Sequence, residues 1–78
     1  METTLRKLIA DVAETTNVDF DMDADLRDEL DIDSHRAVDL VFQVENAFGI
    51  TIPADRFDEL RTLRKAMALV ASMKGAAA

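Results

Sequence analysis

The sequence predicts an all-α protein, a small four-helix bundle with three main helices, one short third helix and a long loop after the first. Apolar residues recur every three or four positions along three segments, the period of an amphipathic helix. Of 78 residues only two are glycine and one is proline, and none is tyrosine or tryptophan, which disfavours an all-β domain. Because the chain also lacks cysteine, packing alone must stabilise the fold.

The first helix is expected over about residues 3–15, where one face carries Leu5, Leu8, Ile9 and Val12. Residues 16–33 then predict a long loop, because acidic residues crowd together there and the helical stripe disappears. Scattered apolar side chains should anchor this loop, and a helical turn or two is expected within residues 24–30.

The clearest periodic segment predicts a second helix over about residues 34–48, ended by Gly49. Pro53 is placed to open a short helix over about residues 54–60. The last helix is expected over about residues 62–73, with Gly75 ending it and residues 75–78 frayed. Residues 1–78 are therefore expected to form a single domain.

Charge narrows the range of partners. The net charge is −7, and residues 1–33 hold eleven acids and three bases, a local charge of −8. Such a surface repels nucleic acid and favours basic protein surfaces. The sequence has no run of eighteen apolar residues and no apolar N-terminal stretch, so we expect no membrane insertion and a cytoplasmic, monomeric protein.

Catalytic groups are scarce, since the chain offers one histidine, no cysteine, no tyrosine and no glycine-rich phosphate loop. We therefore expect a protein that is not an enzyme. The pair Asp33-Ser34 at the start of the second helix allows two interpretations, a structural helix cap and a site of phosphate attachment. Either side chain suits a helix N-cap, and a phosphate on the serine would meet the free amides of the first turn.

The chain resembles the acyl carrier protein family in two runs, LRDELDIDS at residues 26–34 and ENAFGITIP at residues 45–53. Val38-Asp39-Leu40-Val41 and Arg61-Thr62-Leu63 extend the resemblance, which covers residues 3–73. It implies that Ser34 is esterified by 4′-phosphopantetheine, with Asp33 as its motif neighbour. It also implies that the protein carries acyl intermediates as thioesters, in fatty acid, lipid or related biosynthesis.

The same resemblance implies two kinds of partner. One is a phosphopantetheinyl transferase, which attaches the arm, and the other comprises acyl-transferring or synthase enzymes with basic docking surfaces. Two alternatives stay open: a carrier of aminoacyl or polyketide intermediates, and a helical interaction adaptor with an unmodified serine.

The surface around the serine departs from the family pattern at two positions. His35 stands where leucine is usual, and Arg36 stands where an acidic or polar residue is common. We expect the partner-facing or acyl-pocket surface to comprise His35, Arg36, Val38, Asp39, Phe42 and Glu45. Because Arg36 would oppose a basic docking patch, this surface predicts a dedicated partner.

The alternating acids Asp19, Asp21, Asp23 and Asp25 suggest a calcium-binding loop. In a calcium-binding EF-hand loop the sixth residue is glycine and the twelfth is glutamate, whereas this chain has Ala24 and Leu30. A specific metal site is therefore not expected. Two interpretations remain: these carboxylates bind divalent cations weakly, or the acidic loop is merely solvated.

Overall fold

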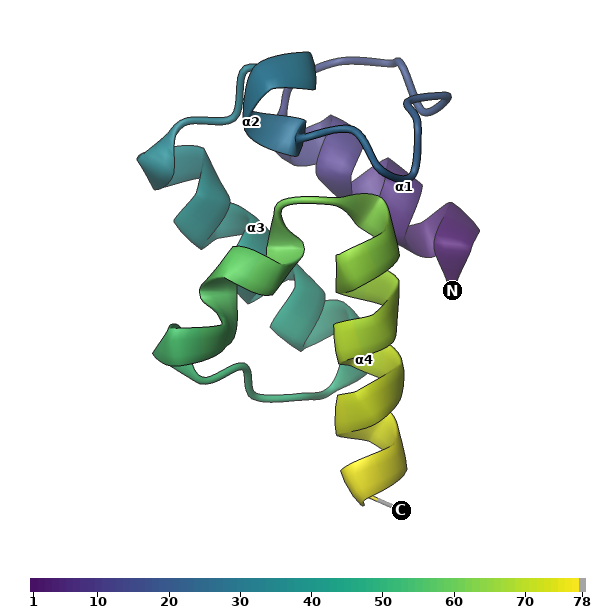
Figure 1. The fold of residues 1–78 in the computed structure, drawn as a ribbon, viewed down its shortest axis with the longest axis vertical. Helices are drawn as coiled ribbons and strands as arrows, with labels where there is room; N and C mark the ends of the chain where they lie inside the picture. Colours follow the sequence, from purple (N-terminus) through teal and green to yellow (C-terminus); the bar gives the residue numbers. More distant parts are fainter. Residues whose placement is uncertain (78) are drawn as a thin grey trace.

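The computed structural model describes residues 1–77, and the prediction for Ala78 lies outside them. These residues form four α-helices and one 3₁₀-helix: α1 Glu2–Val12, α2 Leu26–Glu29, α3 Ser34–Phe48, η1 Ala54–Leu60 and α4 Leu63–Ala77. Figure 1 shows how they are arranged. No strand occurs within the described residues. The predicted all-α class is confirmed.

The core lies where the three long helices meet. Helix α1 packs against α3 and α4, and η1 packs against both α3 and α4. In each helix the apolar residues that recur every three or four positions form one face, and this face points inward. The buried side chains are Leu5, Ile9, Ala10, Phe20, Leu26, Ile32, Leu40, Val41, Val44, Ile52, Leu60, Leu63, Ala66, Leu69 and Val70.

Helix α1 ends at Val12, three residues before the predicted end at residue 15. Glu14 adopts the left-handed conformation with φ of 59°, and its amide donates to the Asp11 carbonyl. The amide of Thr15 donates to the Ala10 carbonyl at 3.0 Å. These two hydrogen bonds form a Schellman motif, which satisfies the last carbonyls of the helix without a glycine.

Helix α4 continues through Gly75 to Ala77, beyond the predicted end at residue 73. A glycine ends a helix where the chain turns into the left-handed region, as Gly49 does after α3 with φ of 65°. After Gly75 the sequence continues with alanine, the strongest helix former, so the helix pattern is not interrupted.

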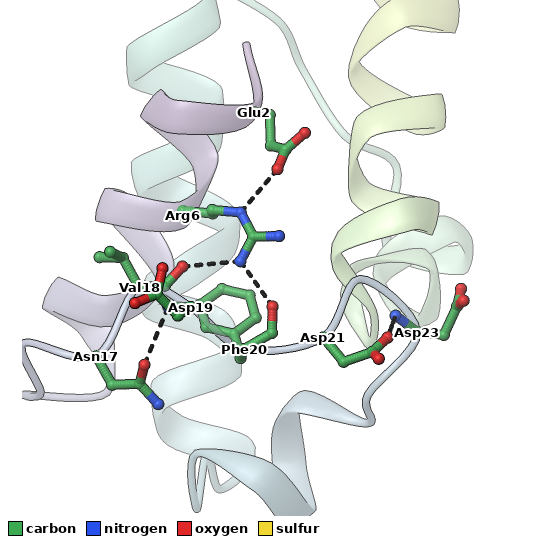
Figure 2. A network of polar contacts seen from close by, with 8 residues as sticks. All are labelled: Glu2, Arg6, Asn17, Val18, Asp19, Phe20, Asp21 and Asp23. Carbon is green, nitrogen blue, oxygen red and sulfur yellow. Dashed lines mark hydrogen bonds and ion pairs between the residues drawn. The ribbon is translucent and has the colours of Figure 1, made fainter.

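The long connection between α1 and α3 is anchored from α1 by Arg6 (Figure 2). Arg6 Nη1 donates to the carbonyl of Val18 at 2.7 Å and to that of Phe20 at 2.6 Å. Its guanidinium also lies over the Phe20 ring, 5.1 Å from the centroid, and its Nε donates to Glu2 at 2.9 Å. One side chain therefore fixes the middle of the loop and seats Phe20 in the core.

The far end of the loop is held by the start of α4. The amide of Arg64 donates to the Met22 carbonyl at 3.0 Å, and Arg64 Nε lies 2.6 Å from Asp23 Oδ1. Arg61 Nη2 lies 2.6 Å from Asp25 Oδ2. We call these two ion pairs the arginine clasp. Asp25 also caps α2, whose four residues are the only helical turn inside the predicted loop of residues 16–33.

Candidate functional site at the start of α3

Asp33, and not Ser34, is the N-cap of α3. Its backbone is extended, with φ of −82° and ψ of −178°, and its Oδ1 accepts a 2.9 Å hydrogen bond from the amide of Arg36. Ser34 is therefore the first residue of the helix and is exposed. Its hydroxyl forms no hydrogen bond within residues 1–77, so capping leaves it available for chemistry.

An apolar cavity of about 200 Å³ opens beside this serine. Its wall is formed by α2, α3 and η1 together with the residue between α2 and α3 that enters the core, Ile32. The lining comprises Leu26, Arg27, Ile32, Ser34, Ala37, Val38, Leu40, Val41, Phe57, Asp58, Leu60 and Arg61. Since Ser34 is exposed and also lines the cavity, the space reaches the surface at the serine.

The size of the cavity limits what can enter it. Pockets for drug-sized ligands measure roughly 300–1,000 Å³, and an engineered cavity of roughly 150 Å³ in another protein binds benzene. At about 200 Å³ this cavity accommodates a short apolar chain. Arg27, Asp58 and Arg61 are the charged residues of its lining.

Val38 and Phe42 are the large apolar residues of α3 that are exposed to solvent. The exposed fractions are 43% for Val38 and 57% for Phe42. Val38 also lines the cavity, whereas Phe42 lies one turn further along the helix and does not. The pair forms an exposed apolar strip that begins at the cavity.

Arg36 does not extend into solvent from this face. Its Nη1 donates to the carbonyl of Val12 at 3.2 Å, and its Nη2 lies 2.9 Å from Glu14 Oε2. The guanidinium therefore binds the C-terminal end of α1, where carbonyls lack helical partners. This pairing directs the charge toward α1, and a role of Arg36 in partner docking stays a prediction.

Glu45 is also engaged by the fold. Its Oε2 accepts a 2.7 Å hydrogen bond from the amide of Ile52, and its carbonyl accepts from the amides of Gly49 and Ile50. Among the polar residues of the predicted docking surface, His35 and Asp39 remain exposed, and His35 Nε2 lies 3.9 Å from Asp39 Oδ2. Asp39 is thus the one exposed carboxylate within α3.

The four aspartates of the loop do not converge on a common point. No group of three or more metal-ligating side chains occurs among residues 1–77. Asp23 and Asp25 bind arginines, and the hydrogen bonds from Arg64 and Arg61 lower the pKa of these two carboxyls below the ordinary value. Asp21 accepts from the amide of Asp23, while the amide of Asp19 donates to Asn17 (Figure 2).

Comparison with known proteins decides the family. Residues 3–70 match the family model described as a phosphopantetheine attachment site. The chain belongs to the acyl carrier protein family. It is 32% identical to an acyl carrier protein of Treponema pallidum over 68 residues, which cover 87% of each chain.

Two further acyl carrier proteins show the breadth of the likeness. Acyl carrier protein 2 of Pseudomonas aeruginosa is 33% identical over 67 residues, 86% of this chain and 85% of that protein. The polyketide-8 synthase acyl carrier protein 2 of Streptomyces avermitilis is 28% identical over 71 residues, 91% and 82% of the two chains. The relatives therefore include a carrier named for a polyketide synthase beside proteins named only as acyl carrier proteins.

Membership establishes the function and the prosthetic group. The protein is an acyl carrier, and its cofactor is covalently attached 4′-phosphopantetheine, whose thiol holds the acyl group as a thioester. Within residues 1–77 no helix has both the length and the apolar character needed to cross a bilayer.

Some residues of the site could not be assigned from the sequence. Arg27 and Arg61 line the cavity although they lie far apart in the chain, and Phe57 reaches it from η1. Apolar spacing indicates that Phe57 points inward, but no spacing places it opposite Ser34. The amide of Leu26 donates to the Arg61 carbonyl at 2.7 Å, so the positions of the two arginines depend on how α2 meets the end of η1.

Proposed function

We propose that Ser34 is the attachment residue for 4′-phosphopantetheine, with Asp33 holding the helix start beside it. The observation that carries this is the free, exposed hydroxyl at the first position of α3, directly beside the apolar cavity. Because Asp33 satisfies the amide of Arg36, the hydroxyl of Ser34 has no structural duty that modification would disrupt.

We further propose that the chain acts as one carrier domain and performs no catalysis of its own. A phosphopantetheinyl transferase would install the arm in the cytoplasm, where coenzyme A supplies it, and acyl-transferring or synthase enzymes would then load and unload it. The fold's contribution is to present Ser34 and to shelter part of the acyl chain. The cavity of about 200 Å³ favours short chains in fatty acid, lipid or related biosynthesis.

A polyketide carrier is the second candidate. It is supported by the 28% identity to the Streptomyces avermitilis polyketide carrier over 91% of this chain. Loading with short fatty acyl and polyketide-type extender groups, followed by transfer to synthases of each kind, separates the two candidates. An aminoacyl carrier is tested by the same route with an aminoacyl-activating enzyme.

The attachment site is tested with coenzyme A and a phosphopantetheinyl transferase. Intact mass should rise by one phosphopantetheine in the wild type and stay unchanged in Ser34→Ala. Ser72→Ala serves as the matched control and should gain the same mass, because Ser72 is an exposed serine on α4. An unmodified wild type with several transferases would favour the adaptor reading, in which the serine stays free.

A further inference from the structure

Two cations line the cavity beside Ser34, and their surroundings differ. Arg61 is committed to the arginine clasp, with Nη2 2.6 Å from Asp25 Oδ2, and its carbonyl accepts the amide of Leu26 at 2.7 Å. Arg27 donates to Asp25 Oδ1 only through its backbone amide, at 3.0 Å. Within residues 1–77 its guanidinium forms no ion pair, although it borders the cavity.

The two residues before Arg27 hold its backbone in place. Its neighbour Leu26 is buried, 1% exposed, and lies in the core cluster. Asp25 caps the turn that carries both residues. The backbone of Arg27 is therefore fixed although its side chain is free to meet a ligand. Figure 1 shows this turn, α2, at the end of the molecule where α3 begins.

The charges around Ser34 explain why a free cation matters here. The Asp33 carboxylate already occupies the N-terminus of α3, which would otherwise attract an anion. Asp31 precedes it, and Asp58 lines the cavity. A further anion beside Ser34 is therefore placed among carboxylates, and of the two arginines in the lining, Arg61 is paired with Asp25 and Arg27 is left to offset the charge.

We propose that Arg27 binds an oxyanion carried by the prosthetic arm at the mouth of the cavity. This inference rests on the proposed attachment at Ser34. The planar guanidinium presents paired N–H donors that match the oxygens of a phosphate or a carboxylate. Two groups on the arm have this chemistry: the phosphodiester next to the serine and a carboxylate at the end of an acidic acyl chain.

The test observes the Arg27 side chain directly by following its ¹⁵N-labelled Nε–H signal in NMR spectra. Four forms are compared: the unmodified protein, the protein with the bare arm, and the arm loaded with a six-carbon chain that is either neutral or ends in a carboxylate. A phosphodiester ligand shifts the signal in all three arm-bearing forms. A carboxylate ligand shifts it only in the last form. No shift in any form overturns the proposal.

Controls separate binding from a structural effect. The Nε–H signal of Arg61 should stay unchanged, because that guanidinium is already paired with Asp25. Raising the salt concentration should return the Arg27 signal toward its position in the unmodified protein, since an exposed ion pair is screened. Arg27→Gln should leave the spectrum of the unmodified protein intact while abolishing the changes that the arm causes around α2.

The outcomes also distinguish this inference from the proposed attachment site. Intact mass is measured on each sample before the spectra are recorded. A serine that is never modified overturns both proposals, because no arm is then present. A fully modified Ser34 with an unchanged Arg27 signal overturns only the role of Arg27.

Discussion

Arg36 Nη2 lies 2.9 Å from the carboxylate of Glu14, and this contact joins the start of α3 to the end of α1. Glu14 itself is held in the left-handed conformation that ends α1. Arg36 Nη1 donates in addition to the carbonyl of Val12 at 3.2 Å. Two residues after the proposed attachment serine, an arginine thus serves the packing of two helices.

Replacing Arg36 with aspartate should destabilise the protein and give no better docking. The change removes one charge-assisted hydrogen bond and one hydrogen bond to a carbonyl, and it puts two acids side by side. Together these effects should lower the free energy of unfolding by about 1–3 kcal/mol. Urea denaturation of wild type and Arg36→Asp measures this loss. His35→Leu is the control and should change stability little, because the His35 side chain is 87% exposed. Equal stability of Arg36→Asp and wild type would show that the contact with α1 is unimportant.

Leu40 and Phe42 are two residues apart on α3 and should respond in opposite ways to truncation. Leu40 is 3% exposed, so Leu40→Ala should cost about 2–5 kcal/mol in the free energy of unfolding. Phe42 is 57% exposed, so Phe42→Ala should cost much less and should instead weaken transfer by acyl-processing enzymes. Thermal unfolding and the KM of an acyl-transferring enzyme for each variant, both carrying the arm, provide the comparison. The prediction is wrong when both variants unfold equally easily.

Glu45→Ala should destabilise the link between α3 and η1. The variant leaves the amide of Ile52 without its 2.7 Å partner beside a buried side chain, which costs about 1–3 kcal/mol. Glu45→Gln retains an acceptor oxygen and should recover most of the loss. Asn46→Ala changes an exposed neighbour and is the matched control. Hydrogen exchange at the Ile52 amide should accelerate in Glu45→Ala alone, and slow exchange there would contradict the assignment.

The arginine clasp should make the stability of the fold more sensitive to acid. The bound arginines lower the pKa of Asp23 and Asp25 in the folded state, so the unfolded chain takes up protons first as the pH falls. The stabilisation is therefore present above the ordinary aspartate pKa of about 4 and is lost as the pH falls through the lower folded values.

The double variant Arg61→Gln, Arg64→Gln provides the measurement. Its melting temperature should lie below that of wild type at pH 6, and the difference should shrink steadily below about pH 4. Lys65→Gln alters a neighbouring exposed cation that forms no side-chain ion pair within residues 1–77 and should show no such convergence. A difference that persists at pH 2 would mean that the arginines stabilise the fold by packing and not by charge.

Periodicity was sufficient to predict the helical class and the inward faces of the helices. The stripe of α3 gives buried Leu40 and Val44, and the spacing also leaves Val38 and Phe42 at the edge, where the structure exposes them. In α4 the buried side chains are Leu63, Ala66, Leu69 and Val70, which form a wide stripe. In a small bundle, helices on two sides cover a wide apolar stripe. Residue spacing alone therefore does not distinguish a buried position at the edge of the stripe from the position next to it.

The site was less predictable, since its polar contacts join distant segments. Sequence places Asp33 and Ser34 at a helix start, yet the choice of cap depends on the extended backbone of Asp33. Nothing in the local sequence indicates that Arg36 reaches α1 or that Glu45 binds the Ile52 amide. Long polar side chains have several rotamers, and the packed helices around them decide which partner each one meets.

The Arg6 contacts with Val18 and Phe20 divide the connection between α1 and α2 into two parts. Residues 16–17 form a short first arc between the Schellman motif that ends α1 and the Arg6 contact at Val18, and because both ends of this arc are fixed, its length affects closure entropy only logarithmically. Residues 21–25 are held by Arg6 on one side and by the arginine clasp on the other. Extra residues should therefore be accommodated in the first arc, whereas one extra residue in the second would shift α2 and carry Arg27 away from the serine.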